Sequence, residues 1–270
     1  MSVVSAMIVP GSPLPYVRSD NPPWGRLAEA MTCAGESLAK SQPDTIVVYS
    51  TSWMAVLDQL WQTRPHLTGV HVDENWHEYG ELPFDIKIDT DLASGAVEHA
   101  NAAGIKSKSV NYDQFPIDTG TIVASNFLNP NGQYPLMIAS NNLYHDWTIT
   151  ERLGQIVRDV AEEQNKRIAV VGVGKLSGSF YRHEIDESED KVFSEKEDSW
   201  NKKMLDLLSN GEISTFFELC PQYAQEAKVE MGFKHMAFLK GALGDQLKKG
   251  KVHAYEPIYG AGAAVVEFLV

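Results

Sequence analysis

Cysteine, basic side chains and long apolar runs are all scarce in this sequence. Its two cysteines, Cys33 and Cys220, lie far apart and outside any metal-ligand spacing, which excludes a disulfide framework or a zinc module and favours reduced thiols in a cytoplasmic protein. The 23 lysines and arginines face 36 acidic residues, and a net charge of −13 disfavours binding to nucleic acid or anionic membranes. No run approaches the ~20 apolar residues that cross a bilayer. The apolar N-terminus lacks the basic start of a signal peptide.

Apolar runs and amphipathic segments alternate along the whole chain. The apolar runs predict strands over residues 3–9, 44–53, 135–139, 168–173 and 263–270. The amphipathic segments predict helices over about 22–38, 91–104, 148–160, 200–211 and 224–243. Thr148 and Glu151 have the spacing of a capping box at the start of the third of these helices. The alternation predicts a single α/β domain over residues 1–270, with a largely parallel central sheet flanked by helices.

The strand over residues 44–53 ends in Ser50, Thr51, Ser52 and Trp53. In an open α/β sheet the carboxyl ends of the strands are where functional sites lie, so this end is a candidate site. Ser52 is not in a Gly-x-Ser-x-Gly elbow, which argues against a serine hydrolase. The glycines of 172–178 also follow a strand, but their spacing is one residue too long for a dinucleotide-binding turn.

Two polar segments leave alternatives open. His71 and His77, with Glu81 nearby, could hold a metal if the segment folded back on itself, but their spacing of six fits no common ligand pattern and favours a surface or interface loop. Residues 186–198 are strongly acidic with few apolar side chains, which predicts a solvated surface excursion.

Five local patterns, spread over nearly the whole chain, carry a family resemblance. They are Pro10-Gly11-Ser12-Pro13, Tyr49-Ser50-Thr51-Ser52-Trp53, Ile117-Asp118-Thr119-Gly120, Gly174-Lys175-Leu176-Ser177-Gly178 and Gly241-Ala242-Leu243. In this order they resemble the class III extradiol ring-cleavage dioxygenases, the LigB-like family. The opening at Ile8 to Tyr16 is most similar to α chains of the two-component members.

The resemblance implies the fold of the family without its metal-binding and catalytic histidines. Enzymes of the family hold non-haem Fe(II) by two histidines and a glutamate, and use two further histidines in Asp-His-Gly and Ser-His motifs. Carried over by position, the four histidines fall on Gly11 or Ser12, on Ser52, on Thr119 and on Gly178. The nearest candidate for the glutamate is Glu230. One carboxylate cannot hold ferrous iron in place of three ligands, so the resemblance implies degenerate positions without catalytic or metal-binding residues.

In two-component members an α chain of this kind pairs with a homologous β chain that carries the iron, commonly as α2β2. The resemblance therefore implies a non-catalytic α subunit without a cofactor of its own, in an assembly that opens 2-aminophenol-type rings with O₂. It would place the acidic segment and residues 71–79 at or near the interface, or where they protect the site of the β chain. One alternative is a stand-alone, iron-free binding or regulatory protein for an aromatic ligand, and another is an enzyme with an unfamiliar ligand set of His71, His77 and Glu81.

Overall fold

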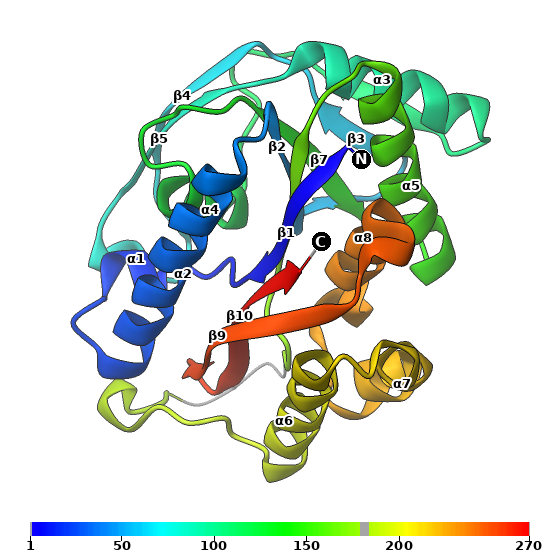
Figure 1. Ribbon diagram of the computed structural model, residues 1–270. Coiled ribbons are helices and arrows are strands. Elements are labelled where there is room, and N and C mark those ends of the chain that lie inside the picture. Colours follow the sequence, from blue (N-terminus) through cyan, green and yellow to red (C-terminus); the bar gives the residue numbers. More distant parts are fainter. Residues whose placement is uncertain (1, 179–183, 270) are drawn as a thin grey trace.

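An eight-stranded sheet runs through the centre of the computed structural model, which describes residues 2–178 and 184–269 (Figure 1). The strand order is β6-β3-β7-β2-β8-β1-β10-β9. The strands are β1 (Val3–Val9), β2 (Thr45–Ala55), β3 (Gln59–Gln62), β6 (Ser107–Val110), β7 (Leu136–Asn142), β8 (Ile168–Val173), β9 (Lys249–Ile258) and β10 (Ala261–Leu269). The central strands β7, β2, β8 and β1 are parallel, whereas β10 and β9 continue the sheet antiparallel and β3 runs antiparallel to β7. The predicted α/β domain with a largely parallel sheet is confirmed.

Helices cover both faces of this sheet (Figure 1). One face packs against α3 (Thr90–Ala102), α5 (Trp147–Glu163), α6 (Glu195–Asn210), α7 (Ile213–Glu226) and α8 (Lys234–Leu243). The other packs against α1 (Leu14–Val17), α2 (Pro22–Ser41), α4 (Thr119–Leu128) and a hairpin of β4 (His66–His71) and β5 (Leu82–Lys87). Because side chains alternate along a strand, successive residues pack into the hydrophobic cores on opposite faces of the sheet. Ile8 packs into the core on the first face and Met7 into the core on the second. Within the two described ranges, every helix is too short or too polar to cross a bilayer.

The ends of the helices follow local capping chemistry. Ser194 begins α6 by accepting the N–H of Glu197, and Gly211 ends it in the left-handed region with φ 77°, where glycine is the favoured residue. For α5 the predicted capping box at Thr148 is wrong. The N-cap is Asp146, whose side chain accepts the N–H of Ile149 at 2.8 Å, and the helix begins at Trp147.

The long helix predicted over residues 224–243 is also wrong, because the chain breaks in the middle of it. Helix α7 ends at Glu226, and the 3₁₀ turn η3 (Glu230–Phe233) separates it from α8. Met231, Gly232 and Phe233 all have φ between 48° and 66°. This left-handed conformation is costly for Met231 and Phe233, and the fully buried ring of Phe233 helps to hold it in place.

The acidic segment is not a wholly solvated excursion, since residues 186–190 (the acidic strap) are bonded to the body of the protein. Glu187 accepts hydrogen bonds from Arg18 and from the hydroxyl of Tyr79. The bond that Tyr79 donates to this carboxylate raises the pKa of Tyr79 to about 12. Asp190 accepts the indole N–H of the buried Trp24 at 2.9 Å and the backbone N–H of Tyr259 at 2.6 Å. The strap includes the 3₁₀ turn η2 (Glu187–Glu189) and joins α2 to the β9–β10 turn.

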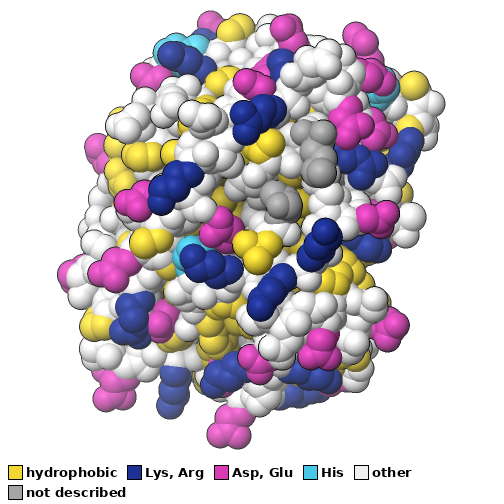
Figure 2. Space-filling model, in the orientation of Figure 1, with side chains coloured by type: hydrophobic (Ala, Val, Ile, Leu, Met, Phe, Trp, Pro, Cys, Tyr) yellow, Lys and Arg dark blue, Asp and Glu magenta, His cyan; other side chains and the backbone are white. Residues whose placement is uncertain are grey.

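Charge of both signs is mixed on the face of the molecule that Figure 2 shows. On the face shown in Figure 2, lysine and arginine side chains lie among aspartate and glutamate side chains rather than in a separate field. Several of the surface charges form pairs, such as Arg26 with Glu256 and Lys202 with Asp198. Exposed pairs of this kind contribute about 0–1 kcal/mol each, so they do not determine the fold.

Candidate functional site

The candidate site lies where β2 leaves its regular pairing with β7. From one register pair to the next, β2 advances from Tyr49 to Met54 while β7 advances only from Ala139 to Asn141. The extra residues of β2 form a bulge over residues 50–53, a feature that commonly redirects side chains beside functional sites. Here the bulge directs Ser50 toward α4, and its hydroxyl donates to Asp118 at 2.5 Å. The same carboxylate oxygen accepts the N–H of Thr121 and so caps the helix.

Two of the positions implied by the family resemblance meet at this edge. Gly11 follows β1, and a Cβ placed on it would lie 3.7 Å from the hydroxyl of Ser52. The same Cβ would lie 2.9 Å from Val173 Cγ1, a separation that real Cβ atoms essentially never show, and 3.0 Å from the Cα of Gly120, which is also tight. A side chain at Gly11 would therefore require Val173 or the start of α4 to move. Ser12, the alternative position, accepts the N–H of Leu14 at 3.5 Å at the start of α1.

Thr119, the third position, ties the hairpin to the first residue of α4. Its hydroxyl donates to Asp73 at 2.9 Å, and the ring Nε2 of His71 lies 2.8 Å from the same oxygen. Since the hydroxyl proton goes to Asp73, Nε2 of His71 is the donor in the second bond. His71, Asp73 and Glu74 have ligand atoms within 4.8 Å of one another.

The alternative ligand set expected from the sequence does not assemble. His77 belongs to the exposed turn η1 (His77–Tyr79), where its ring Nδ1 lies 3.3 Å from the carbonyl of Glu74. Neither His77 nor Glu81 is part of a described group of three side chains that could hold a metal ion. The aromatic residues of this segment pack inward instead, and the ring of Trp76 contacts Tyr259 at 4.7 Å between centroids.

Gly178 and Glu230 form a second group, between the loop after β8 and η3. A Cβ on Gly178 would lie 3.1 Å from the carbonyl of Lys228 and 3.4 Å from the Cα of Glu230. The carboxylate of Glu230 accepts the backbone N–H of Lys175 at 2.6 Å. Ser177, beside Gly178, is buried and accepts from the N–H of Gly262 at 2.7 Å. These polar groups hold the two loops together.

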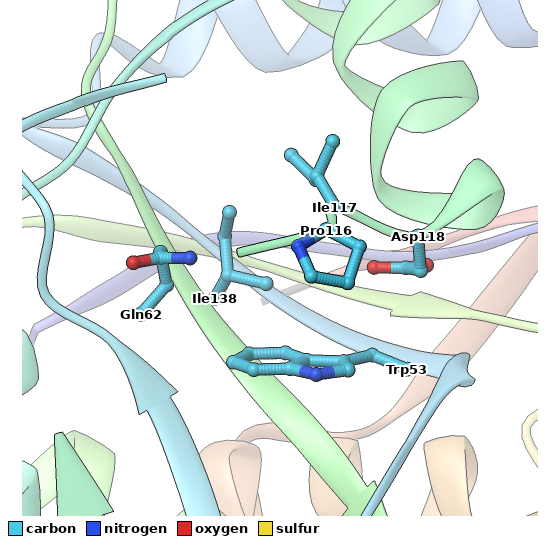
Figure 3. Close-up of a pocket in the computed structure, with 6 residues that line it drawn as sticks. All are labelled: Trp53, Gln62, Pro116, Ile117, Asp118 and Ile138. Carbon is cyan, nitrogen blue, oxygen red and sulfur yellow. The ribbon is translucent and has the colours of Figure 1, made fainter. Parts of the chain in front are cut away.

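A narrow hollow lies beside the bulge, between the sheet and the segment that leads into α4 (Figure 3). The indole of Trp53 forms one wall, and Pro116 and Ile138 lie opposite it. One carboxylate oxygen of Asp118 is buried there without a hydrogen-bond partner among the described residues. The space amounts to about 170 Å³, part of it open to solvent, and none of it is wide enough to seat a water molecule. An aromatic ring therefore does not fit between these side chains as they stand.

His235 is a residue of this region that the sequence analysis did not single out. It is completely buried on α8, and neither ring nitrogen has a partner among the described residues. A Cβ on Gly174 would lie 2.8 Å from its Nδ1, so the glycine makes room for the ring beside the bulge. Burial lowers the pKa of His235 from 6.5 to about 3. The glycines at 172 and 174 after a strand were the available signal, because glycine in a strand often marks a close approach.

The side chains at the candidate site do not fit a ferrous ion. Gly11 and Gly178 offer no ligand atom, Ser52 and Thr119 offer hydroxyls, and Glu230 is already bonded to a backbone N–H. Non-haem Fe(II) sites of this type need two imidazoles and a carboxylate on one face of the ion. The nearby imidazole of His71 belongs to a different loop and is bonded to Thr119.

Fold and site together define a chain built on a ring-opening dioxygenase scaffold. The family model "Catalytic LigB subunit of aromatic ring-opening dioxygenase" matches residues 10–268, and the chain belongs to this family. It is 49% identical over 271 residues, covering 100% of both chains, to the 2-aminophenol 1,6-dioxygenase alpha subunit of a Pseudomonas species. It is also 25% identical to the beta subunit of a 2-aminophenol 1,6-dioxygenase from Pseudomonas, over 98% of this chain and 93% of that one.

Two more distant proteins show how widely the fold is shared. The 3,4-dihydroxyphenylacetate 2,3-dioxygenase of Escherichia coli is 22% identical over 80% of this chain and 79% of its own. The crystal structure of the uncharacterized protein JW3007 from Escherichia coli K12 superposes with a TM-score of 0.66 at 14% identity, covering 98% of this chain and 99% of that one. At this identity the second likeness establishes the fold alone.

Proposed function

We propose that this chain is the non-catalytic α subunit of a two-component extradiol dioxygenase that opens 2-aminophenol-type rings with O₂. Its partner would be a homologous β chain that holds Fe(II), in an α2β2 assembly, and this chain would hold no cofactor. The observation that carries the proposal is the closure of the site at Gly11, where Val173 and Gly120 crowd the position that the Cβ of a metal-binding histidine would take.

The surroundings of Gly11 support the same conclusion. A site that had lost one ligand through a point change would keep the cavity, whereas here the strand ends are packed and bonded to one another. Ser50 is bonded to Asp118, and Thr119 to Asp73. Because polar groups buried at such a site cost free energy unless they are paired, these bonds stabilise the scaffold in the absence of an ion.

The direct test compares the chain alone with the chain co-expressed with a histidine-bearing β homologue. We expect the isolated chain to be folded, to contain far less than one iron per chain by elemental analysis, and to consume no O₂ with 2-aminophenol. The co-purified complex should contain iron and turn over. Stoichiometric iron together with turnover in the isolated chain would refute the proposal.

Ser52→Ala in the co-expressed complex is the matched variant. Since Ser52 would contribute no ligand, iron content and kcat should stay within about twofold of the wild-type complex. A histidine-to-alanine change at a metal ligand of the β chain should abolish both and serves as the positive control. A loss of several orders of magnitude in kcat from Ser52→Ala, with the complex still assembled, would show that this chain takes part in the chemistry.

The alternative function, an iron-free binder of an aromatic ligand, is disfavoured by the narrow hollow at Trp53. Isothermal titration of the isolated chain with 2-aminophenol distinguishes the two functions. The subunit function predicts no saturable binding, because Trp53, Pro116 and Ile138 leave no space for a ring.

A further inference from the structure

The carboxyl ends of the neighbouring strands β2 and β7 carry a concentration of exposed apolar side chains. Eleven large hydrophobic side chains are exposed in the described part of the chain, and five of them come from two short segments, 54–57 and 143–144. We call these five the strand-end patch: Met54, Val56, Leu57, Leu143 and Tyr144. Leu57 is 87% exposed and Tyr144 79% exposed. Single exposed apolar residues are ordinary, but a contiguous group marks a contact surface.

The backbone holds the two segments of the patch side by side. Met54 pairs with Asn141 and Ala55 with Asn142 in the sheet, and the N–H of Leu143 donates to the carbonyl of Ala55 at 2.9 Å. The ammonium group of Lys234 donates to the carbonyls of Asn142 and Leu143 at 2.8 and 3.2 Å. The patch is therefore preorganised, and covering it costs little conformational entropy.

The patch is also continuous with the degenerate site. On β2 the side chains of Ser52 and Met54 are exposed, and Val56, just past the end of the strand, continues this alternation, so the exposed row begins at the residue on which the family resemblance places a metal-ligand histidine. Residues 54–57 carry no charge, and the next residue, Asp58, is paired with Lys108 at 2.8 Å. An apolar centre bordered by paired charges is the composition of an interface core and its rim.

We infer that the strand-end patch is the surface on which the homologous β chain of the proposed assembly docks. This inference rests on the proposed function. The relatives indicate which chain would cover the patch. A protein named as a beta subunit is similar to 98% of this chain, so the partner would share the fold. Two chains of one fold commonly associate about a pseudo-two-fold axis through corresponding surfaces, and strand-end loops would then meet strand-end loops.

The test uses the complex of the full chain with a histidine-bearing β homologue. A Leu57→Asp, Tyr144→Asp variant would bury two carboxylates in the contact, and we expect its dissociation constant to rise by roughly tenfold or more in analytical ultracentrifugation. Leu269→Asp is the matched control. Leu269 is 50% exposed, but it lies at the end of β10, which runs antiparallel to β1. It is therefore at the opposite end of the strands from the patch, and that variant should bind like the wild type.

Hydrogen exchange of the wild-type chain provides a measurement that does not depend on the folding of a variant. Amides of residues 54–57 and 143–145 should become more protected in the complex, while those near residue 269 should not change. Wild-type affinity in the double variant, or no added protection in the patch, would overturn the inference and leave the proposed function standing. A wild-type chain that associates with no histidine-bearing homologue would overturn both. A homodimer of this chain that the double variant disrupts would assign the patch to a second copy instead.

Discussion

The buried imidazole of His235 predicts that the protein loses stability on mild acidification. The ring lies fully buried on α8 beside Gly174 and the edge of Phe233, and neither nitrogen has a described partner. Protonating it in place would put an unpaired charge in the core, which is why burial lowers its pKa to about 3. In the unfolded chain the same ring titrates near its ordinary value of 6.5.

The sign and size of the effect follow from proton linkage. Between pH 6.5 and about 3 the unfolded chain binds a proton that the folded chain does not bind, so the free energy of unfolding falls as the pH falls through this window. From pH 7 to pH 5 the unfolded ring goes from about one-quarter protonated to almost fully protonated, and the integrated loss in the free energy of unfolding is about 2 kcal/mol. For a chain of this size that corresponds to a decrease in Tm of roughly 4–8 °C.

The assay is chemical denaturation of wild type and His235→Leu at pH 7 and pH 5, in buffers of equal ionic strength. Because every other titrating group is common to both proteins, the difference between their pH dependences isolates His235. The variant should lose about 2 kcal/mol less than the wild type over this interval. Equal losses in wild type and His235→Leu would refute the reasoning.

Two further predictions concern packing and the acidic strap. In Gly241→Ala the new Cβ would lie 1.8 Å from the carbonyl oxygen of Glu151, so α8 must move away from α5. Urea unfolding should show that the free energy of unfolding falls by about 3 kcal/mol or more. A fall of less than about 1 kcal/mol would contradict the contact. Asp190→Asn weakens the acceptor for the indole of Trp24, and limited proteolysis within 186–193 should become faster, whereas the exposed neighbour Glu189→Gln should be cut at the wild-type rate.

The sheet could be predicted because its central strands are nearly continuous apolar runs. Such runs become buried strands whatever elements pack against them. The strand β9 was missed because it lies at an edge, is only partly buried along most of its length, and contains Gly250 and Pro257. The break between α7 and α8 had Gly232 as its only local signal. The left-handed conformations of Met231 and Phe233 oppose their own propensities, so packing sets them and a sequence pattern cannot show them.

The candidate site, too, could be predicted from the sequence only in part. The positions Gly11, Ser52 and Thr119 came from family patterns, and the structure places Gly11 and Ser52 side by side. What the sequence could not show is that the space at Gly11 is closed, because that depends on Val173 and Gly120, which are remote in the chain. The burial of His235 is likewise a tertiary fact, since a single histidine on an apolar helix face has no distinguishing pattern.

The closed site and the exposed strand-end patch have a common physical basis. An enzyme must keep the carboxyl ends of its central strands open to substrate, and apolar side chains that attracted another chain there would block entry. In a chain whose strand ends are closed at Gly11 this constraint is absent. Met54, Leu57 and Tyr144 can then project from the same edge without blocking the entry of a substrate. Placing a charge in the patch with Leu57→Asp should therefore weaken assembly of the proposed complex before it changes the chemistry of any complex that remains. A drop in kcat per bound β chain at full occupancy, rather than a drop in occupancy, would contradict this order of effects.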